Sequence, residues 1–304
     1  MPLLKDVEVD GQRVDVRVND TAITEVGRSL RPSDEEEVVD GGGGALLPGL
    51  HDHHAHVLAM AAADRSVHLD GASDVAAALS AADQELPPGA WLRAVGWDGS
   101  VDLDRAVLDA VVGDRPVRVQ HRSGALWVLN GAALQRVGVE DSSGRLFGGD
   151  ALLRERIDGS ETLDIPAVGE RLASYGVTGI TDATPFSDLS GPGLVAGAGL
   201  PQRVVLTGAP GLTIEDGPAD VVWGPAKVVL ADHALPALVD VVEEFRMARR
   251  RGRSVAVHSV TVASLVLALA AWDEVGSRPG DRIEHGAVIP ADLIPVSRPS
   301  ASPS

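Results

Sequence analysis

The chain has 304 residues, 44% of them apolar, so it can bury a full-sized core and most simply forms one large domain with a small appendage. Its formal charge of −18 argues against binding a nucleic-acid backbone. It has no long apolar run or secretory signal, so we expect a cytoplasmic protein without membrane partners. The absence of cysteine excludes thiolate ligands, so any metal site must use histidine, carboxylate or a lysine-derived oxygen.

The N-terminal segment, residues 4–39, alternates apolar and polar residues with turn residues between the runs. This pattern predicts short antiparallel strands. The apolar run ALLPGL at residues 45–50 then predicts a buried strand, and it is followed directly by HDHHAH at residues 51–56. A strand that ends in a cluster of polar ligands is typical of the functional face of a barrel.

Residues 60–165 have mixed character and are interpreted as an insertion after the first barrel strand. Within them we expect a helix around residues 74–86, a turn at 91–99, a strand at 116–121 and a helix around 125–137.

From Ile165 onward, helical stretches alternate with short β-rich runs, which indicates parallel βα units. These runs are GVTGITDAT, PQRVVLTGA, AKVVLAD, SVAVHSV and DRIEHGA. Together with ALLPGL they give six barrel strands, whereas the usual barrel has eight. We therefore expect the chain to stop in mid-fold.

His54 and His56 form a His-x-His pair at the end of a predicted strand. Residues i and i+2 of a strand point to the same face, so both imidazoles can reach one ion. The pair alone is weak evidence, because two surface histidines often bind nothing. His51 is expected to pack or to form a hydrogen bond instead.

Lys227, His258 and His285 occupy the same relative place, near the tips of three separate predicted strands. A lone histidine in a strand is usually a satisfied core residue. The repetition of position is therefore the main evidence that these residues meet at one face of a barrel and share a metal site.

Lysine occurs only at Lys5 and Lys227, while arginine supplies every other strong base. A lysine within an apolar strand is costly unless its charge is removed or paired, and burial lowers its pKa. A neutral amine can add carbon dioxide to form a carbamate, which can bridge two cations, and arginine cannot do this chemistry. The alternative is a partly exposed lysine at the start of a strand.

These motifs resemble those of the amidohydrolase superfamily, and specifically of its N-substituted formamide deformylase-like branch. The family's first-strand signature resembles PGLHDHHAH, its carboxylated-lysine strand AKVVLADH, its third-histidine strand VAVHSVT and its fourth DRIEHGA. The branch's Trp/Asn segment resembles HRSGALWVLNGAAL. The resemblance extends from about Val7 to Pro295.

The resemblance implies an α/β fold, a metal-dependent-hydrolase (β/α)8 TIM-type barrel with a small β-sandwich built from both chain ends. Here the barrel would be incomplete, with about six strands. Residues 1–47 would form the N-terminal part of the sandwich and residues 48–295 the barrel, with its insertion at about 60–165. Residues 296–304, rich in Pro and Ser, are expected to be a disordered tail.

The resemblance further implies hydrolysis of an amide-like or formamide-like carbon–nitrogen bond in a small molecule by metal-activated hydroxide. His54 and His56 would bind a first metal, His258 and His285 a second, and carboxylated Lys227 would bridge them. Lys227, His258 and His285 are accordingly also the candidate catalytic residues. One or two divalent ions are expected, zinc first, although iron, manganese or nickel would also suit the ligands.

Two departures from the family pattern stand out. The family's eighth strand carries an aspartate that binds metal and shuttles a proton, and no residue here can be assigned that role. Ala125 occupies the place where the branch often has a histidine, while nearby His121 is expected mainly to form local hydrogen bonds. The further candidates for contacting substrate or orienting the ligands are Asp52, His121, Trp127, Asn130, Asp182 and Asp232. Aspartates at strand ends are equally explained as turn formers.

Two classes of function remain open. The first is a working hydrolase, completed by a neighbouring subunit in a homo-oligomer or by a six-stranded arrangement. The second is a truncated, catalytically impaired chain that binds metal or acts only through interactions, because an open barrel exposes strand edges and apolar helix faces. A sugar or nucleotide isomerase ranks last, since no phosphate-binding glycine loop is present.

Overall fold

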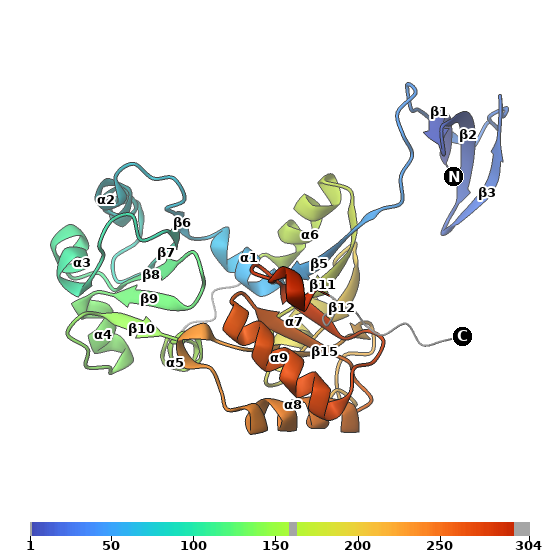
Figure 1. The fold of residues 1–304 in the computed structure, drawn as a ribbon. Coiled ribbons are helices and arrows are strands. Elements are labelled where there is room, and N and C mark those ends of the chain that lie inside the picture. Colours follow the sequence, from blue (N-terminus) through green and yellow to red (C-terminus); the bar gives the residue numbers. More distant parts are fainter. Residues whose placement is uncertain (1, 158–162, 295–304) are drawn as a thin grey trace. The chain divides into compact units, whose positions relative to one another are not determined.

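The computed structural model describes residues 2–157 and 163–294. The chain divides into two compact units, residues 1–51 and 52–304 (Figure 1). The mixed α/β class expected from the sequence is confirmed. No helix in the described ranges is long and apolar enough to cross a membrane.

The N-terminal unit contains one four-stranded sheet in the order β3-β2-β1-β4. Its strands are β1 (Pro2–Val9), β2 (Gln12–Asn19), β3 (Ala22–Gly27) and β4 (Glu37–Asp40). The first three are antiparallel, as predicted, whereas β4 pairs with β1 in parallel. This sheet is compatible with a contribution to a β-sandwich, which stays a prediction.

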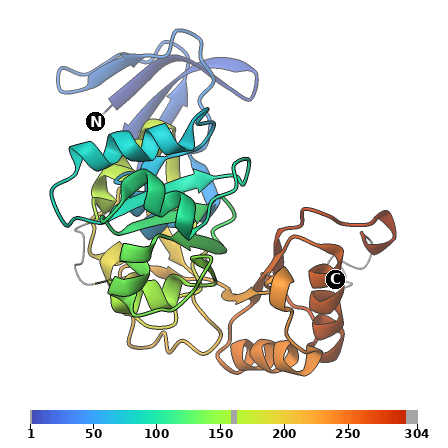
Figure 2. The same cartoon turned by 90° about the vertical axis from the view of Figure 1, so that its left-hand side faces the viewer.

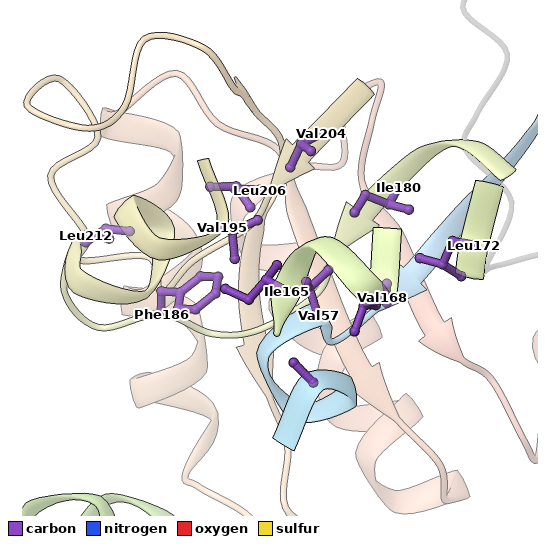
Figure 3. Packing of buried hydrophobic residues seen from close by; sticks show 12 residues of the cluster. Val57, Ile165, Val168, Leu172, Ile180, Phe186, Val195, Val204, Leu206 and Leu212 are labelled. Atoms are coloured by element: carbon purple, nitrogen blue, oxygen red, sulfur yellow. The ribbon is translucent and has the colours of Figure 1, made fainter. Parts of the chain in front are cut away.

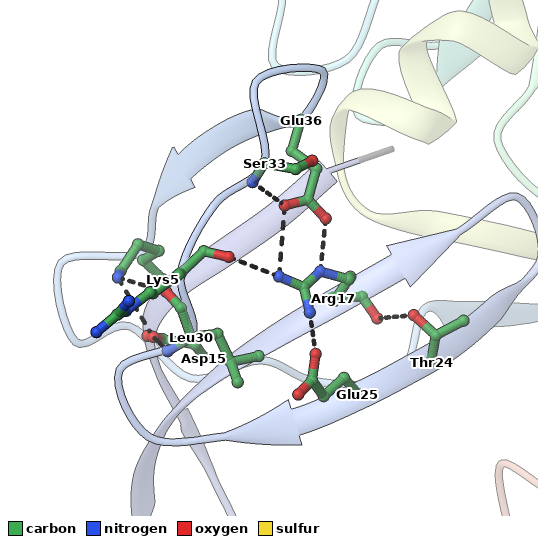
Figure 4. Close-up of polar contacts among 9 residues, drawn as sticks. Lys5, Asp15, Arg17, Thr24, Glu25, Leu30, Ser33 and Glu36 are labelled. Atoms are coloured by element: carbon green, nitrogen blue, oxygen red, sulfur yellow. Dashed lines mark hydrogen bonds and ion pairs between the residues drawn. The ribbon is translucent and has the colours of Figure 1, made fainter.

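Arg17 on β2 holds the loop between β3 and β4 against the sheet (Figure 4). Its Nε donates to Glu36 Oε1 at 2.5 Å, and its Nη1 pairs with Glu25. The Glu36 side chain is only 2% exposed and also accepts from Ser33 N at 2.9 Å. The hydrogen bond from Arg17 lowers the pKa of Glu36, so this carboxylate is charged and fully partnered.

The second unit contains three sheets, of which the first has the order β13-β12-β11-β5. Its strands are β5 (Leu50–Ala55), β11 (Val177–Asp182), β12 (Arg203–Leu206) and β13 (Val222–Trp223). The helices that accompany it are α1 (Val57–Ala63), α6 (Ile165–Ser174) and α7 (Ser190–Ala196). Ile180, Leu206 and Val168 are fully buried in the core that these elements share (Figure 3).

The strand predicted at residues 45–50 lies later in the sequence than expected. Residues 45–50 do not form a buried strand, since Leu47 is 72% and Leu50 57% exposed. Pro48 has no backbone N–H to donate to a neighbouring strand, which explains why the strand starts only at Leu50. The histidine-rich segment is therefore the strand itself and not the loop beyond it.

The predicted insertion forms a sheet of its own, in the order β10-β9-β8-β7-β6. Its strands are β6 (Val67–His68), β7 (Leu92–Trp97), β8 (Val117–His121), β9 (Leu126–Leu129) and β10 (Arg145–Phe147). Its helices are α2 (Val75–Glu85), α3 (Arg105–Val112), α4 (Gly131–Val137) and α5 (Asp150–Arg156). The helix expected around residues 74–86 and the strand at 116–121 are confirmed.

Two predictions in this region were wrong. The turn expected at residues 91–99 is mostly strand β7, because Leu92 and Ala94 are buried, and the turn itself begins at Asp98. The helix expected around residues 125–137 is strand β9 followed by the short helix α4. Asn130 caps this helix by accepting from Ala133 N at 2.9 Å, so it begins only after the apolar, aromatic run.

The third sheet has the order β14-β15-β16, with all its strands parallel. Its strands are β14 (Ala226–Val229), β15 (Val255–Ser259) and β16 (Arg282–His285), and its helices are α8 (Leu238–Arg250) and α9 (Val262–Val275). Short 3-10 helices cover Asp232–Ala234 and Ala291–Leu293. Helices α8 and α9 pack side by side (Figures 1 and 2), with Phe245 and Trp272 in ring contact at 5.2 Å.

The described part of the chain thus has seven strands in this arrangement, the predicted ones and β13, but they belong to two sheets instead of one. Specific contacts join these two sheets. Lys227 N donates to Gly208 O at 2.8 Å, which connects the start of β14 to the end of β12. Arg282 Nη2 on β16 donates to His53 O on β5 at 3.3 Å. Closure into a barrel stays a prediction.

Candidate metal centre

Strand β5 and the start of α1 supply two imidazoles to the candidate site. His54 is the penultimate residue of β5, and His56 is the N-cap residue of α1. Their ring centroids lie 5.1 Å apart. The Nδ1 atom of His56 lies 3.0 Å from the Thr184 hydroxyl, whereas that of His54 contacts the Glu284 carboxylate.

The third sheet brings two further imidazoles to the same place. His258 lies on β15 and His285 ends β16, with His285 Nε2 3.0 Å from His258 Nδ1. The ring centroids of His285 lie 4.6 Å from those of both His258 and His54. The four histidines that the sequence singled out therefore form a continuous chain of ring contacts, from His56 to His258.

His285 has a backbone conformation unusual for a residue with a side chain. Its φ angle is 68°, in the left-handed region. Gly286 N donates to Glu284 O at 2.9 Å across it, so β16 ends in a γ-turn. Successive residues of a regular strand point to opposite faces, yet Glu284 and His285 both reach His54. The turn at His285 makes this possible.

Lys227 is the second residue of β14 and is 3% exposed. Its Nζ has no hydrogen-bond partner among the residues that the structure describes. Burial lowers the pKa of Lys227 to about 8, against the opposing attraction of the Glu284 carboxylate. A minor fraction of the amine, much larger than for an ordinary lysine, is therefore neutral near physiological pH, and its lone pair is then available to react.

Burial also lowers the pKa values of three of the imidazoles. It lowers the pKa of His258 to about 4, with further lowering by His285. Burial is also the largest cause of the lowered pKa values of His56 and His285. Neutral imidazole is the form that binds metal.

The donor set fits a divalent metal, because it combines neutral imidazoles with a buried amine that has no partner. As the side chains lie, however, no three His, Asp or Glu residues in the described ranges surround one point in ligand geometry. One reason is visible in the contacts, since His285 Nε2 faces His258 Nδ1. Metal binding would require these two rings to turn.

Two of the three candidate aspartates accept hydrogen bonds from backbone groups, and the third accepts one from a side-chain hydroxyl. Asp182, fully buried at the end of β11, accepts from Val57 N and from Thr184 N, each at 2.9 Å. It thereby fixes the backbone at Val57, next to His56, and at Thr184, whose hydroxyl contacts His56. Asp52 accepts from His54 N at 2.9 Å, and the exposed Asp232 accepts from the Thr261 hydroxyl.

The three candidates in the insertion make their contacts within its sheet. His121 lies 2.8 Å from the Ser123 hydroxyl and packs edge-on against Trp97, in agreement with the expected local role. Trp127 is buried and donates from Nε1 to Asp150 Oδ1 at 3.1 Å. Asn130 is fully buried and uses both its amide oxygen and its amide nitrogen in four hydrogen bonds to backbone groups. No contact joins these three to the histidine cluster in the described structure.

Glu284 was missed by the sequence analysis. It is 6% exposed and contacts both His54 and Arg282, whose Nε donates to Glu284 Oε1 at 2.7 Å. Burial would raise the pKa of Glu284, but the hydrogen bond from His54 and the charges of Lys227 and Arg282 lower it overall. The signal that could have revealed it is the position of Glu284 directly after Ile283 within the short predicted strand DRIEHGA.

Residues 37–298 match the model of the amidohydrolase family. The chain belongs to the amidohydrolase family. Among solved structures, this family member is similar to an uncharacterized metal-dependent hydrolase from Pyrococcus horikoshii OT3, with 17% identity and a TM-score of 0.70 over 97% of this chain and 72% of that one. A metal-dependent hydrolase from Pyrococcus furiosus gives 18% identity and a TM-score of 0.67 over 97% and 74%. These likenesses support the fold. No curated protein matches the chain.

Proposed function

We propose that this amidohydrolase-family chain is a metal-dependent hydrolase that cleaves non-peptide carbon–nitrogen bonds in amide-like or formamide-like small molecules. The observation that carries the proposal is the gathering of four imidazoles from β5, the start of α1, β15 and β16. The charge of a buried lysine, Lys227, acts on three of them, and its Nζ has no hydrogen-bond partner among the described residues. These residues are far apart in sequence, and a packing role alone would not select imidazole four times.

In this proposal the cluster would supply two pairs of ligands, and Lys227 would supply a bridging group. His54 and His56 would hold one ion, and His258 and His285 a second. The neutral amine of Lys227 would attack carbon dioxide, forming an N–C bond and releasing one proton, to give a carbamate with two oxygens. The low pKa and the free Nζ support this assignment.

A bound divalent metal supplies two effects, since it lowers the pKa of a coordinated water and polarises a carbonyl oxygen. The chain's own residues hold the proposed ligands in position. Asp182 fixes the backbone that leads from His56 into α1, and Arg282 ties β16 to β5. Zinc is the first candidate, because it accepts imidazole nitrogen and carboxylate-type oxygen in one site.

Activity is tested with zinc-loaded protein, in bicarbonate, against a panel of N-substituted formamides and simple amides, by measuring release of the amine and of the matching carboxylate, which is formate for the formamides. Wild-type protein should turn over at least one class, while Lys227→Met and His258→Ala proteins that remain folded should not. Phe147→Ala, a change at an exposed residue of the insertion, is the matched control. Turnover that survives in both site variants would contradict the proposal.

A second candidate is a metal-binding chain without hydrolytic activity. It is favoured by the absence, among described residues, of three side chains already in ligand geometry. Zinc binding that depends on the four histidines, without turnover of any substrate in the panel, would support this alternative.

A further inference from the structure

Glu284 is a buried carboxylate that faces charged or polar partners on several sides. Arg282 Nε donates to one oxygen at 2.7 Å, and His54 Nδ1 contacts the other. The positive charge of Lys227 also acts on it. Placing a carboxylate here costs desolvation, and one ion pair with Arg282 would already compensate its charge. The second contact, with His54, therefore calls for its own explanation.

A carboxylate can only accept a hydrogen bond, so its contact with Nδ1 requires a proton on that nitrogen. The lone pair of a neutral His54 is then on Nε2, which becomes the atom free to bind a metal. His56 provides a contrast, because its Nδ1 contacts the Thr184 hydroxyl, which can donate or accept. Of these two neighbouring histidines, His54 is the one whose tautomer is determined by its partner.

The backbone conformation of β16 places the Glu284 carboxylate next to the imidazoles. The γ-turn at His285 lets consecutive residues approach the same ring, His285 by ring contact and Glu284 by hydrogen bond. Arg282 holds the carboxylate and also donates to His53 O, the backbone carbonyl next to His54. The ligand and the group that orients it are thus fixed to each other.

We infer that Glu284 is a positioning residue, which holds His54 in the Nδ1–H tautomer and directs its Nε2 to the metal. A carboxylate that accepts from a metal-binding histidine fixes the ring orientation and makes it a better ligand. The statement that Nε2 of His54 is directed to a metal rests on the proposed function. The statement that His54 is in the Nδ1–H tautomer concerns the metal-free protein and does not depend on it.

The experiment is nitrogen NMR of protein labelled with 15N-histidine, without metal and at about pH 8.5, where an ordinary histidine is neutral. His54 is assigned by loss of its signals in His54→Ala. Wild-type His54 should show the Nδ1–H tautomer, and Glu284→Gln should shift it toward Nε2–H or a mixture. A wild-type His54 in the Nε2–H tautomer would overturn the inference without any need for the variant to fold.

Zinc affinity is then measured by competition with a chromogenic chelator. Glu284→Gln should bind zinc about 10- to 100-fold more weakly than wild type. Glu36→Gln is the matched control, since it removes another buried, arginine-paired carboxylate in the N-terminal unit and should leave zinc affinity unchanged. Equal affinity and an unchanged tautomer in Glu284→Gln would overturn the inference. Wild type that binds no zinc but shows the Nδ1–H tautomer would support the positioning of His54 and instead refute the proposed function.

Discussion

Replacing Lys227 by methionine should stabilise the metal-free protein while destroying its site. Methionine has a similar length and no charge, so it fills the same buried space on β14. Lys227 is 3% exposed and its Nζ has no hydrogen-bond partner in the described structure. The native residue therefore carries a cost in stability that a packing role would not explain.

The size of this effect follows from the pKa of Lys227, which falls from 10.5 to about 8 on folding. At about 1.4 kcal/mol per unit, holding the charged amine costs at most about 3.5 kcal/mol. Some attraction to Glu284 is lost in the variant, so we expect Lys227→Met to raise the free energy of unfolding by about 1–3 kcal/mol near pH 7.

The pH dependence has a definite sign. Below about pH 8 the amine is charged in both folded and unfolded protein, and the full cost applies. Between about pH 8 and 10.5 the unfolded state binds more protons, so wild-type stability rises and the advantage of the variant shrinks. Above this window the amine is neutral in both states and the advantage should vanish.

The assay is denaturant unfolding of both proteins across this pH range, in chelator and without bicarbonate. Lys5→Met is the control, because Lys5 is 34% exposed and pairs with Asp15 at 3.4 Å, so its removal should give no comparable gain. A Lys227→Met protein that is less stable than wild type, or equally stable at every pH, would refute the argument that an unpartnered buried amine is retained for its chemistry.

Three other outcomes are expected. Phe245→Ala removes a fully buried ring from the core beneath β14–β16 and should lower the free energy of unfolding by about 3–5 kcal/mol, measured by denaturant titration. Asn130→Ala should lower the free energy of unfolding by about 2 kcal/mol, because the helix cap and the backbone contacts are lost, and it should leave zinc affinity unchanged. A selective loss of zinc affinity would contradict the structural role of Asn130. Zinc at about 100 times its Kd should raise the free energy of unfolding by about 2.7 kcal/mol, reversibly with chelator, and no shift would count against a built site.

The alternation of helices with apolar runs was sufficient to predict the α/β class and strands β14–β16, which carry Lys227, His258 and His285. It was less reliable where a run of aromatic and β-branched residues passes directly into a helix. Residues 125–137 show this, because the pattern gives no sign that Asn130 ends a strand and caps a helix. The division of β5 and β11–β16 between two sheets depends on long-range pairing, which periodicity does not encode.

The candidate site was predictable where position and chemistry agreed. The pair at His54 and His56 and the strand-borne Lys227 were found because polar groups in apolar strands need a reason. The same argument, applied to Glu284, would have found the carboxylate as well. The γ-turn at His285 was beyond prediction, since the dipeptide His-Gly allows many conformations and tertiary contacts select one.

The most direct test of the metal centre is elemental analysis of protein equilibrated with zinc and bicarbonate and then freed of unbound metal. The wild-type chain should retain one or two zinc ions, and a folded variant with His56 and His258 both replaced by alanine should lose them. Equal zinc in the two proteins, or none in either, would contradict the assignment of these imidazoles as ligands.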